Sequence, residues 1–124
     1  MLNNSQINAI GNILDFSVGK GGNGHSGITY TLQGDTLSLR FSTIVHFASE
    51  RSMRDQVVVL ADESMQRLQG ALKILKNDFK DKTGDELKAK ELSNRDDLEL
   101  IQATSNSPRK IAYYRRFIDL QVDV

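Results

Sequence analysis

The apolar side chains between Asp62 and Lys82 recur at the spacing of an amphipathic helix. Steps of three and four residues place them on one face of a helix that has 3.6 residues per turn. Asp62 is a good N-cap residue, and Gly84 supplies the left-handed conformation that commonly ends a helix. The pattern therefore predicts a main amphipathic helix over 62–82 that anchors the hydrophobic core. The residues of its apolar face are Met65, Leu68, Leu72, Leu75 and Phe79.

Alternating apolar and polar positions predict strands before this helix. The alternation runs over Ile28–Leu32 and again over Thr36–Ala48. Gly34 and Asp35, which lie between them, suit the two-residue turn of a hairpin. In the longer segment one face is polar apart from Ile44. We therefore expect that face of the strand to meet solvent or a partner.

The remaining β-like segments are less regular. Gln56–Leu60 (QVVVL) is too short for periodicity to decide between a third strand and an irregular approach to the main helix. Asp85–Leu92 is compatible with a fourth strand or with a helical turn, and the polar segment Ser93–Asp97 predicts a loop. Leu98–Thr104 favours a strand. In Lys110–Val124 apolar side chains alternate to the last residue, which is consistent with packing against neighbouring copies or other subunits.

The N-terminal region predicts a short helix followed by a glycine-rich arm. Ile7, Ile10 and Leu14 share one face of a helix over Asn3–Asp15. Val18–Gly27 (VGKGGNGHSG) predicts a flexible connection that is too short to separate two domains.

Together these elements predict an α+β fold. We expect an antiparallel sheet of about five or six strands that packs on one main amphipathic helix, with a short N-terminal helix beside it. The 124 residues are enough for one domain with a sizeable core. The expected parts of this single domain (1–124) are the N-terminal helix and arm (1–27), strands (28–60), the main helix (62–82) and further strands (85–124).

Composition narrows the class of protein. Sixteen basic and sixteen acidic side chains cancel, so no whole-chain charge attracts nucleic acid or a membrane surface. The absence of cysteine excludes disulfides, thiolate chemistry and zinc fingers. Neither a signal peptide nor a window of about 20 apolar residues is found. We expect a protein that is cytoplasmic or part of an assembled particle, with no membrane partner and no secretion by a signal peptide.

The motifs of common enzymes are missing. A Walker loop places Gly-Lys-Ser/Thr at a helix N-terminus, whereas the glycine-rich segment leads into the strand predicted at Ile28–Leu32. His25 and His46 lack the His-x-x-x-His or Glu-x-x-His spacing of a metal site. No Gly-x-Ser-x-Gly elbow provides a serine nucleophile. We therefore expect no enzymatic activity, no metal, no cofactor and no small-molecule substrate.

Arg109–Phe117 (RKIAYYRRF) combines basic and aromatic side chains without an acidic residue. On a strand, Tyr114 and Arg116 would share one face with Ala112. Tyr113, Arg115 and Phe117 would share the other face. Guanidinium groups beside aromatic rings suit base stacking and phosphate contact on single-stranded nucleic acid. The same residue types are also favoured at protein–protein interfaces and on protected edge strands. The candidate partner- or nucleic-acid-binding residues are Lys20, Arg40, Arg109, Lys110, Tyr113, Tyr114, Arg115 and Arg116.

These observations favour a non-enzymatic interaction or structural module that acts as a subunit of a larger oligomeric assembly. Such an assembly would be a particle, for example a virion, or a molecular machine. Its partners would be other copies of itself or other protein subunits, bound through a sheet edge and aliphatic strand faces. The N-terminal helix would dock through Ile7, Ile10 and Leu14. The alternative is a single-stranded nucleic-acid-binding protein that uses the strand over 109–117.

Overall fold

The computed structural model describes residues 1–18, 27–101 and 110–124. This part of the chain contains a helix, two strands, a second and longer helix, and two further strands. The elements are α1 (Asn4–Val18), β1 (Ile28–Gln33), β2 (Thr36–Phe47), α2 (Glu50–Thr83), β3 (Lys88–Leu100) and β4 (Lys110–Asp123).

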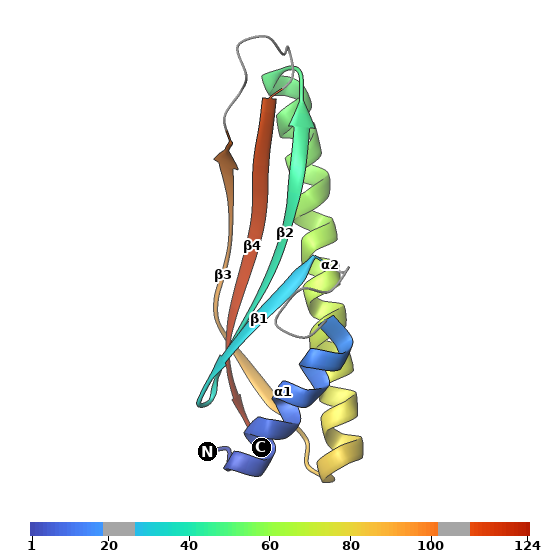
Figure 1. The fold of residues 1–124 in the computed structure, drawn as a ribbon, viewed down its shortest axis with the longest axis vertical. Helices are drawn as coiled ribbons and strands as arrows, with labels where there is room; N and C mark the ends of the chain where they lie inside the picture. The colour runs from blue at the N-terminus through green and yellow to red at the C-terminus, as the bar shows by residue number, and fades with distance from the viewer. Residues whose placement is uncertain (19–26, 102–109) are drawn as a thin grey trace.

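The four strands form one antiparallel sheet with the order β1-β2-β4-β3. α2 runs along β2 and β4, and α1 lies beside α2 near β1 (Figure 1). The fold is therefore α+β, with a sheet packed on a long helix, as predicted. The expectation of five or six strands is wrong. Gln56–Leu60 belongs to α2. Ser93–Asp97 joins the β-like segments before and after it in the single strand β3.

α2 begins at Glu50 rather than at Asp62. Ser49 is its N-cap, and the Ser49 hydroxyl accepts a hydrogen bond from the Ser52 backbone N–H at 3.2 Å. The predicted C-terminal end is confirmed, because Gly84 is the cap residue and has a φ of 78°. Gly84 also donates its N–H to the Lys80 carbonyl at 2.8 Å.

The β-branched segment before Asp62 is helical because the helix extends an apolar face that the sheet can cover. Met53, Val57 and Leu60 recur at steps of four and three residues and pack against the core. Val58 and Val59, in contrast, are 72% and 64% exposed. Tertiary packing thus outweighs the strand preference of a short valine run.

β3 includes Ser93–Asp97, for which the polar sequence predicted a loop. β3 pairs with β4 from Lys88 to Leu100, with an irregularity between Glu91 and Ser93. β3 is an edge strand, and edge strands tolerate polar and charged side chains because one edge and much of their surface meet water. The strands predicted over Ile28–Leu32 and Thr36–Ala48 are confirmed, with a turn at Gly34, whose φ is 60°.

The core lies between the helices and one face of the sheet. Leu68, Leu75 and Phe79 of α2 are at most 1% exposed, and Met65 and Leu72 are partly buried beside them. Burial of each large apolar side chain contributes about 1.5–3 kcal/mol before the entropy loss is subtracted. The strand side chains that line this core are Ile28, Leu37, Leu39, Phe41, Val45, Phe47, Ala112, Tyr114, Ile118, Leu120 and Val122.

α1 completes the same layer. Its Ile10, Ile13 and Leu14 side chains are buried in the core. The Tyr30 hydroxyl, on β1, donates a hydrogen bond to the Asp15 carboxylate of α1. Burial and this hydrogen bond raise the pKa of Tyr30 to about 12. The contact therefore ties α1 to the edge strand β1 over the whole physiological pH range.

The start of α2 can be tested by two substitutions. Ser49→Ala should lower the free energy of unfolding by about 1 kcal/mol, because it removes the side-chain acceptor of the N-cap. Asp62→Ala should change this free energy by less than about 0.5 kcal/mol, because the lost hydrogen bond from Gln66 is offset by the higher helix propensity of alanine. Urea denaturation followed by circular dichroism measures both. A larger loss for Asp62→Ala than for Ser49→Ala would contradict this helix start.

Candidate interaction surface

The sheet has a second face that carries no buried side chain. Strand residues alternate between the two faces, and those that point away from α1 and α2 form what we call the open face. All described side chains on it are exposed or partly exposed. The open face includes Thr29, Thr31, Ser38, Arg40, Ser42, Ile44, His46, Ser93, Arg95, Asp97, Glu99, Ile111, Tyr113, Arg115, Phe117 and Asp119.

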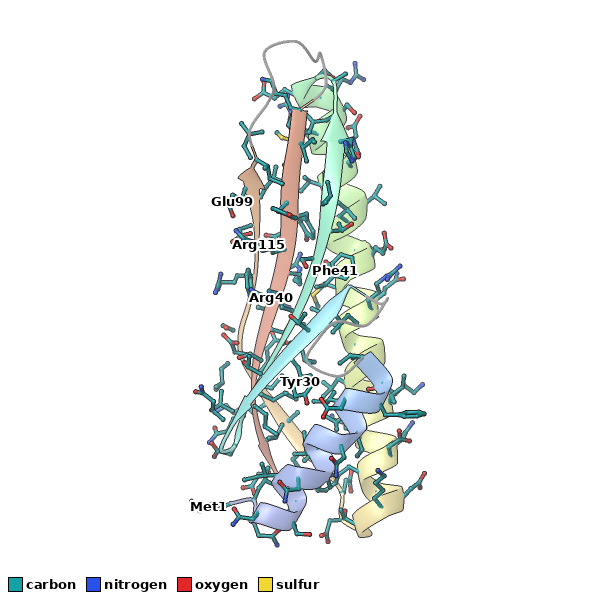
Figure 2. All side chains as sticks on the ribbon, in the orientation of Figure 1. Met1, Tyr30, Arg40, Phe41, Glu99 and Arg115 are labelled. Atoms are coloured by element: carbon teal, nitrogen blue, oxygen red, sulfur yellow. The ribbon has the colours of Figure 1, made fainter. Side chains whose placement is uncertain are left out.

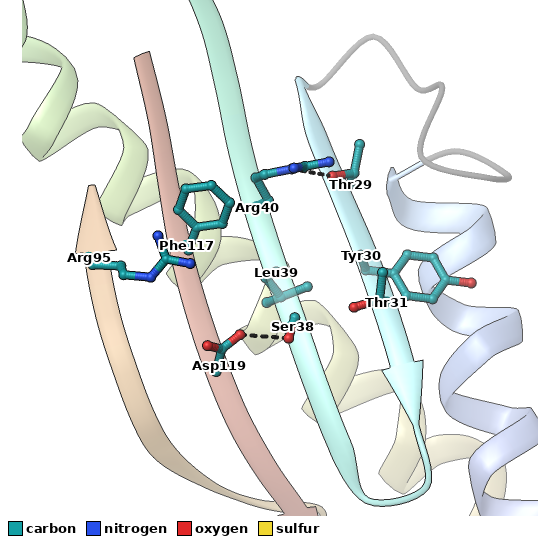
Figure 3. Close-up of a pocket in the computed structure, with 9 residues that line it drawn as sticks. All are labelled: Thr29, Tyr30, Thr31, Ser38, Leu39, Arg40, Arg95, Phe117 and Asp119. Carbon is teal, nitrogen blue, oxygen red and sulfur yellow. Dashed lines mark hydrogen bonds between the residues drawn. The ribbon is translucent and has the colours of Figure 1, made fainter. Parts of the chain in front are cut away.

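Two arginines flank an aromatic ring at the centre of the open face. Arg40 on β2 and Arg95 on β3 are both register partners of Phe117 on β4. Their guanidinium carbons lie 5.7 Å and 4.2 Å from the centroid of the Phe117 ring, which is the range of cation–π contacts. The three side chains form a row across the strands (Figure 3). The row borders a shallow hollow of about 260 Å³.

A charged carboxylate lies beside this row. Asp119 accepts hydrogen bonds from the hydroxyls of Ser38 and Ser93, each at 2.6 Å (Figure 3 shows the first). These hydrogen bonds, and to a smaller extent the charge of Arg95, lower the pKa of Asp119. Asp119 therefore remains ionised at neutral pH.

Arg115, in the next row of the open face, is already paired. Its Nε lies 2.8 Å from an Asp97 oxygen and its Nη2 lies 2.7 Å from a Glu99 oxygen. Arg115 and Glu99 lie close together along β4 and β3 (Figure 2). The hydrogen bond to Asp97, followed by the charges of Asp97 and Glu99, raises the pKa of Arg115. The charge of Arg115 is thus balanced within the chain.

Apolar side chains lie at one end of the open face, in the rows beyond Arg115. Ile44 and Tyr113 are register partners and are 50% and 41% exposed. Ile111 pairs with His46 in the row beyond them and is partly exposed. The open face therefore combines a charged centre with an apolar end.

The basic-aromatic segment is divided between the two faces of the sheet. Tyr114 is 1% exposed and faces α2, and its hydroxyl donates a hydrogen bond to Asp96 at 3.0 Å. The Tyr114 hydroxyl also lies 3.3 Å from the buried Ser64 hydroxyl of α2. Arg116 faces the same side and pairs with Asp96 at 3.3 Å. Tyr114 and Arg116 therefore form part of the contact between the sheet and α2, and Tyr113 and Arg115 form part of the open face.

Other residues predicted to bind partners have different surroundings. Lys110 is exposed at the start of β4. Lys20 and Arg109 lie outside the described residues, as do His25 and most of the glycine-rich arm.

The predicted docking face of the N-terminal helix is occupied by the chain's own core. Ile10 and Leu14 are fully buried, and Ile7 packs against the core from its margin. The alternation in the last strand has the same origin for Leu120 and Val122, whereas Val124 is 40% exposed. Leu120 and Val122 are buried against the helices, so they do not require a second subunit to cover them.

Arg95 and Asp119 belong to the centre of the surface but were not among the predicted residues. The polar sequence of Ser93–Asp97 predicts a loop, and a loop would not place Arg95 on the face of the sheet. The alternation of Arg95, Asp97 and Glu99 with Asp96 and Leu98 is nevertheless typical of a strand with one charged face.

Comparisons with protein-family models, with curated proteins and with solved structures found no match for this chain. Among the residues that the structure describes, no three His, Cys, Asp or Glu side chains are grouped so as to hold a metal ion. No helix in the same ranges is long and apolar enough to cross a membrane.

The environment of Asp119 predicts a dependence of stability on pH. Because its pKa is lower in the folded state than in the unfolded chain, its ionised form stabilises the fold fully above the unfolded value of about 3.9. This contribution is lost as the pH falls through the folded-state pKa. Asp119→Asn should lower the free energy of unfolding by about 1 kcal/mol at neutral pH, and by less at about pH 3.

Urea denaturation at the two pH values measures this difference. Asp55→Asn, at an exposed position of α2, is the matched control and should change the free energy of unfolding little at either pH. A loss for Asp119→Asn that is the same at both pH values would contradict the ionised, hydrogen-bonded state of Asp119.

Proposed function

We propose that this protein is a non-enzymatic interaction module that acts as a subunit of a larger oligomeric assembly, with the open face as its docking surface. One observation carries the proposal. Both helices cover the same face of the sheet, and the opposite face presents Phe117, Tyr113 and Ile44 with arginines between and beside them. Tyrosine, phenylalanine and arginine are the residue types enriched at protein–protein interfaces.

The edges of the sheet are less suited to docking than its open face. β3 carries charged side chains along its length and an irregularity at Glu91/Ser93, two features that discourage pairing with another strand. The pairing of β1 with β2 ends at Phe41. Beyond it, the Gly27 carbonyl accepts a hydrogen bond from the Ser42 backbone N–H at 3.0 Å, and the Gln56 side chain of α2 donates one to the His46 carbonyl at 2.9 Å. These contacts favour the open face over the sheet edge, which the sequence predicts as one of the contact surfaces.

The proposed assembly predicts a solution mass of several times the 13.9 kDa of one chain. Ile44→Asp together with Tyr113→Ala should raise the dissociation constant of the oligomer about tenfold, because interface cores depend on a few apolar and aromatic anchors. The double variant should therefore contain more monomer. Light scattering coupled to gel filtration measures the mass.

Val58→Asp with Val59→Ala provides a matched control on α2, where both valines are exposed, and should leave the mass unchanged. A wild-type protein that is monomeric at micromolar concentration would contradict the assembly. A mass that is unchanged in the Ile44/Tyr113 variant would contradict the use of the open face.

A single-stranded nucleic-acid-binding function is the second candidate, and the Arg40–Phe117–Arg95 row favours it. An aromatic ring on an uncovered sheet face can stack on a base, and flanking guanidinium groups can contact phosphates. The pairing of Arg115 with Asp97 and Glu99, and of Arg116 with Asp96, reduces the positive charge that is left for a phosphate backbone.

Fluorescence anisotropy with labelled oligothymidylate tests this candidate. Specific binding would fall steeply with salt concentration, and Phe117→Leu would weaken it by about 1–3 kcal/mol through lost stacking. Lys73→Gln on the exposed face of α2 serves as a control for non-specific charge effects. Absence of binding at low salt, or equal losses in both variants, would exclude this function.

A further inference from the structure

The arginines of the sheet fall into two groups. Arg115 and Arg116 each pair with at least one carboxylate of β3. Within the described residues, neither Arg40 nor Arg95 has a carboxylate partner within ion-pair distance. The centre of the open face therefore holds two guanidinium groups whose charges are not balanced by a direct ion pair.

Phe117 holds these two groups in place. Each guanidinium lies against the same ring, at 4.2 Å for Arg95 and 5.7 Å for Arg40. Arg40 also donates a long hydrogen bond of 3.4 Å from its Nε to the Thr29 hydroxyl. A guanidinium has five N–H donors, so most donors of both groups remain available. Because contact with the ring already restricts the side chains, less conformational entropy is lost when a ligand binds.

The surroundings of the pair favour one isolated negative charge. Asp119 lies in the row next to Phe117 on one side, and Asp97, which is paired with Arg115, lies in the row on the other side. Successive rows on one face of a strand are about 6.6 Å apart. A chain of regularly spaced phosphates would therefore bring a second negative charge towards Asp119, whereas a single carboxylate between the two arginines adds no second charge there. The hollow of about 260 Å³ beside the row is also small, and the hydroxyls of Thr29, Thr31 and Ser38 lie along it (Figure 3).

We propose that Arg40 and Arg95 bind one Asp or Glu carboxylate of an extended segment of a partner protein. This inference rests on the proposed function, because it identifies what the open face recognises. The Ile44–Tyr113 pair lies four residues along the strands from Arg40 and Phe117, which corresponds to about 13 Å. A segment that runs along the strands would thus carry its acidic residue four positions from an apolar residue. The acidic residue would pair with the arginines, and the apolar residue would cover Tyr113 and Ile44.

Capped pentapeptides provide the probe for this site. Acetyl-Glu-Thr-Thr-Thr-Leu-amide is titrated into the ¹⁵N-labelled full chain, and the reversed sequence Leu-Thr-Thr-Thr-Glu, with the same caps, covers the opposite direction. Peptides with Gln in place of Glu are the matched ligands without the charge. At least one Glu peptide should shift the side-chain Nε–H resonances of Arg40 and Arg95 with a Kd of about 1 mM, and its Gln counterpart should bind about tenfold more weakly.

Variants of the protein identify the residues responsible. Arg40→Gln combined with Arg95→Gln should weaken binding of the Glu peptide about tenfold. Arg54→Gln, at an exposed position of α2, removes a guanidinium away from the open face and should leave the affinity unchanged. Backbone spectra of each variant show whether the fold is retained, and single Arg40→Lys and Arg95→Lys variants test the site if the double variant does not fold.

The possible results separate the carboxylate site from the proposed assembly. Equal binding of the Glu and Gln peptides, or no shift with any peptide at about 10 mM, overturns the carboxylate site. Oligothymidylate that binds more tightly than the Glu peptide and shifts the same arginine resonances overturns the carboxylate site in favour of phosphate recognition. Light scattering on the same samples reports the assembly independently. An oligomer that ignores the peptides removes only the carboxylate site, whereas a monomeric wild-type protein contradicts the assembly whatever the peptides do.

Discussion

Leu68, Leu75 and Phe79 of α2 are buried in one core with the apolar side chains of β2 and β4, and the packing of α2 on the sheet decides the role of the remaining surfaces. A sheet of four strands has two faces, and the chain supplies helices for one of them. Because side chains alternate along a strand, each residue of β4 is assigned either to the core or to the open face. The burial of one helical face thereby determines which charged and aromatic side chains can meet a partner.

A polar group lies within the same contact. Ser64 of α2 is fully buried, and its hydroxyl lies 3.3 Å from both the Tyr114 hydroxyl and the Arg116 Nε. Asp96 accepts hydrogen bonds from Tyr114 and Arg116. Such groups are costly to bury unless they are hydrogen-bonded. Their mutual satisfaction favours one position of α2 along the sheet, and it withdraws one basic and one aromatic side chain from external contacts.

The open face is nearly balanced in charge but uneven in pattern. Arg115 lies between Asp97 and Glu99, Asp119 lies between two serines, and Arg40 and Arg95 share the Phe117 ring without a carboxylate within ion-pair distance in the described ranges. A surface of this kind gains specificity from the positions of its charges more than from their sum. The neutral net charge of the chain is therefore compatible with selective recognition of a charged group.

Periodicity in the sequence determined the α+β class, the apolar face of the main helix from Met65 to Phe79, the two strands of the first hairpin and the end of α2 at Gly84. These features depend on short-range patterns and on the conformational preferences of single residues. The start of α2 and the strand character of Ser93–Asp97 were decided by tertiary structure. Met53, Val57 and Leu60 can extend the helix because the sheet is long enough to cover them, and polar β3 is a strand because β4 supplies its hydrogen bonds. The open-face row of Arg40, Phe117 and Arg95 depends on the register between β2, β4 and β3. Register joins residues far apart in the chain, and no local pattern of residues specifies that pairing.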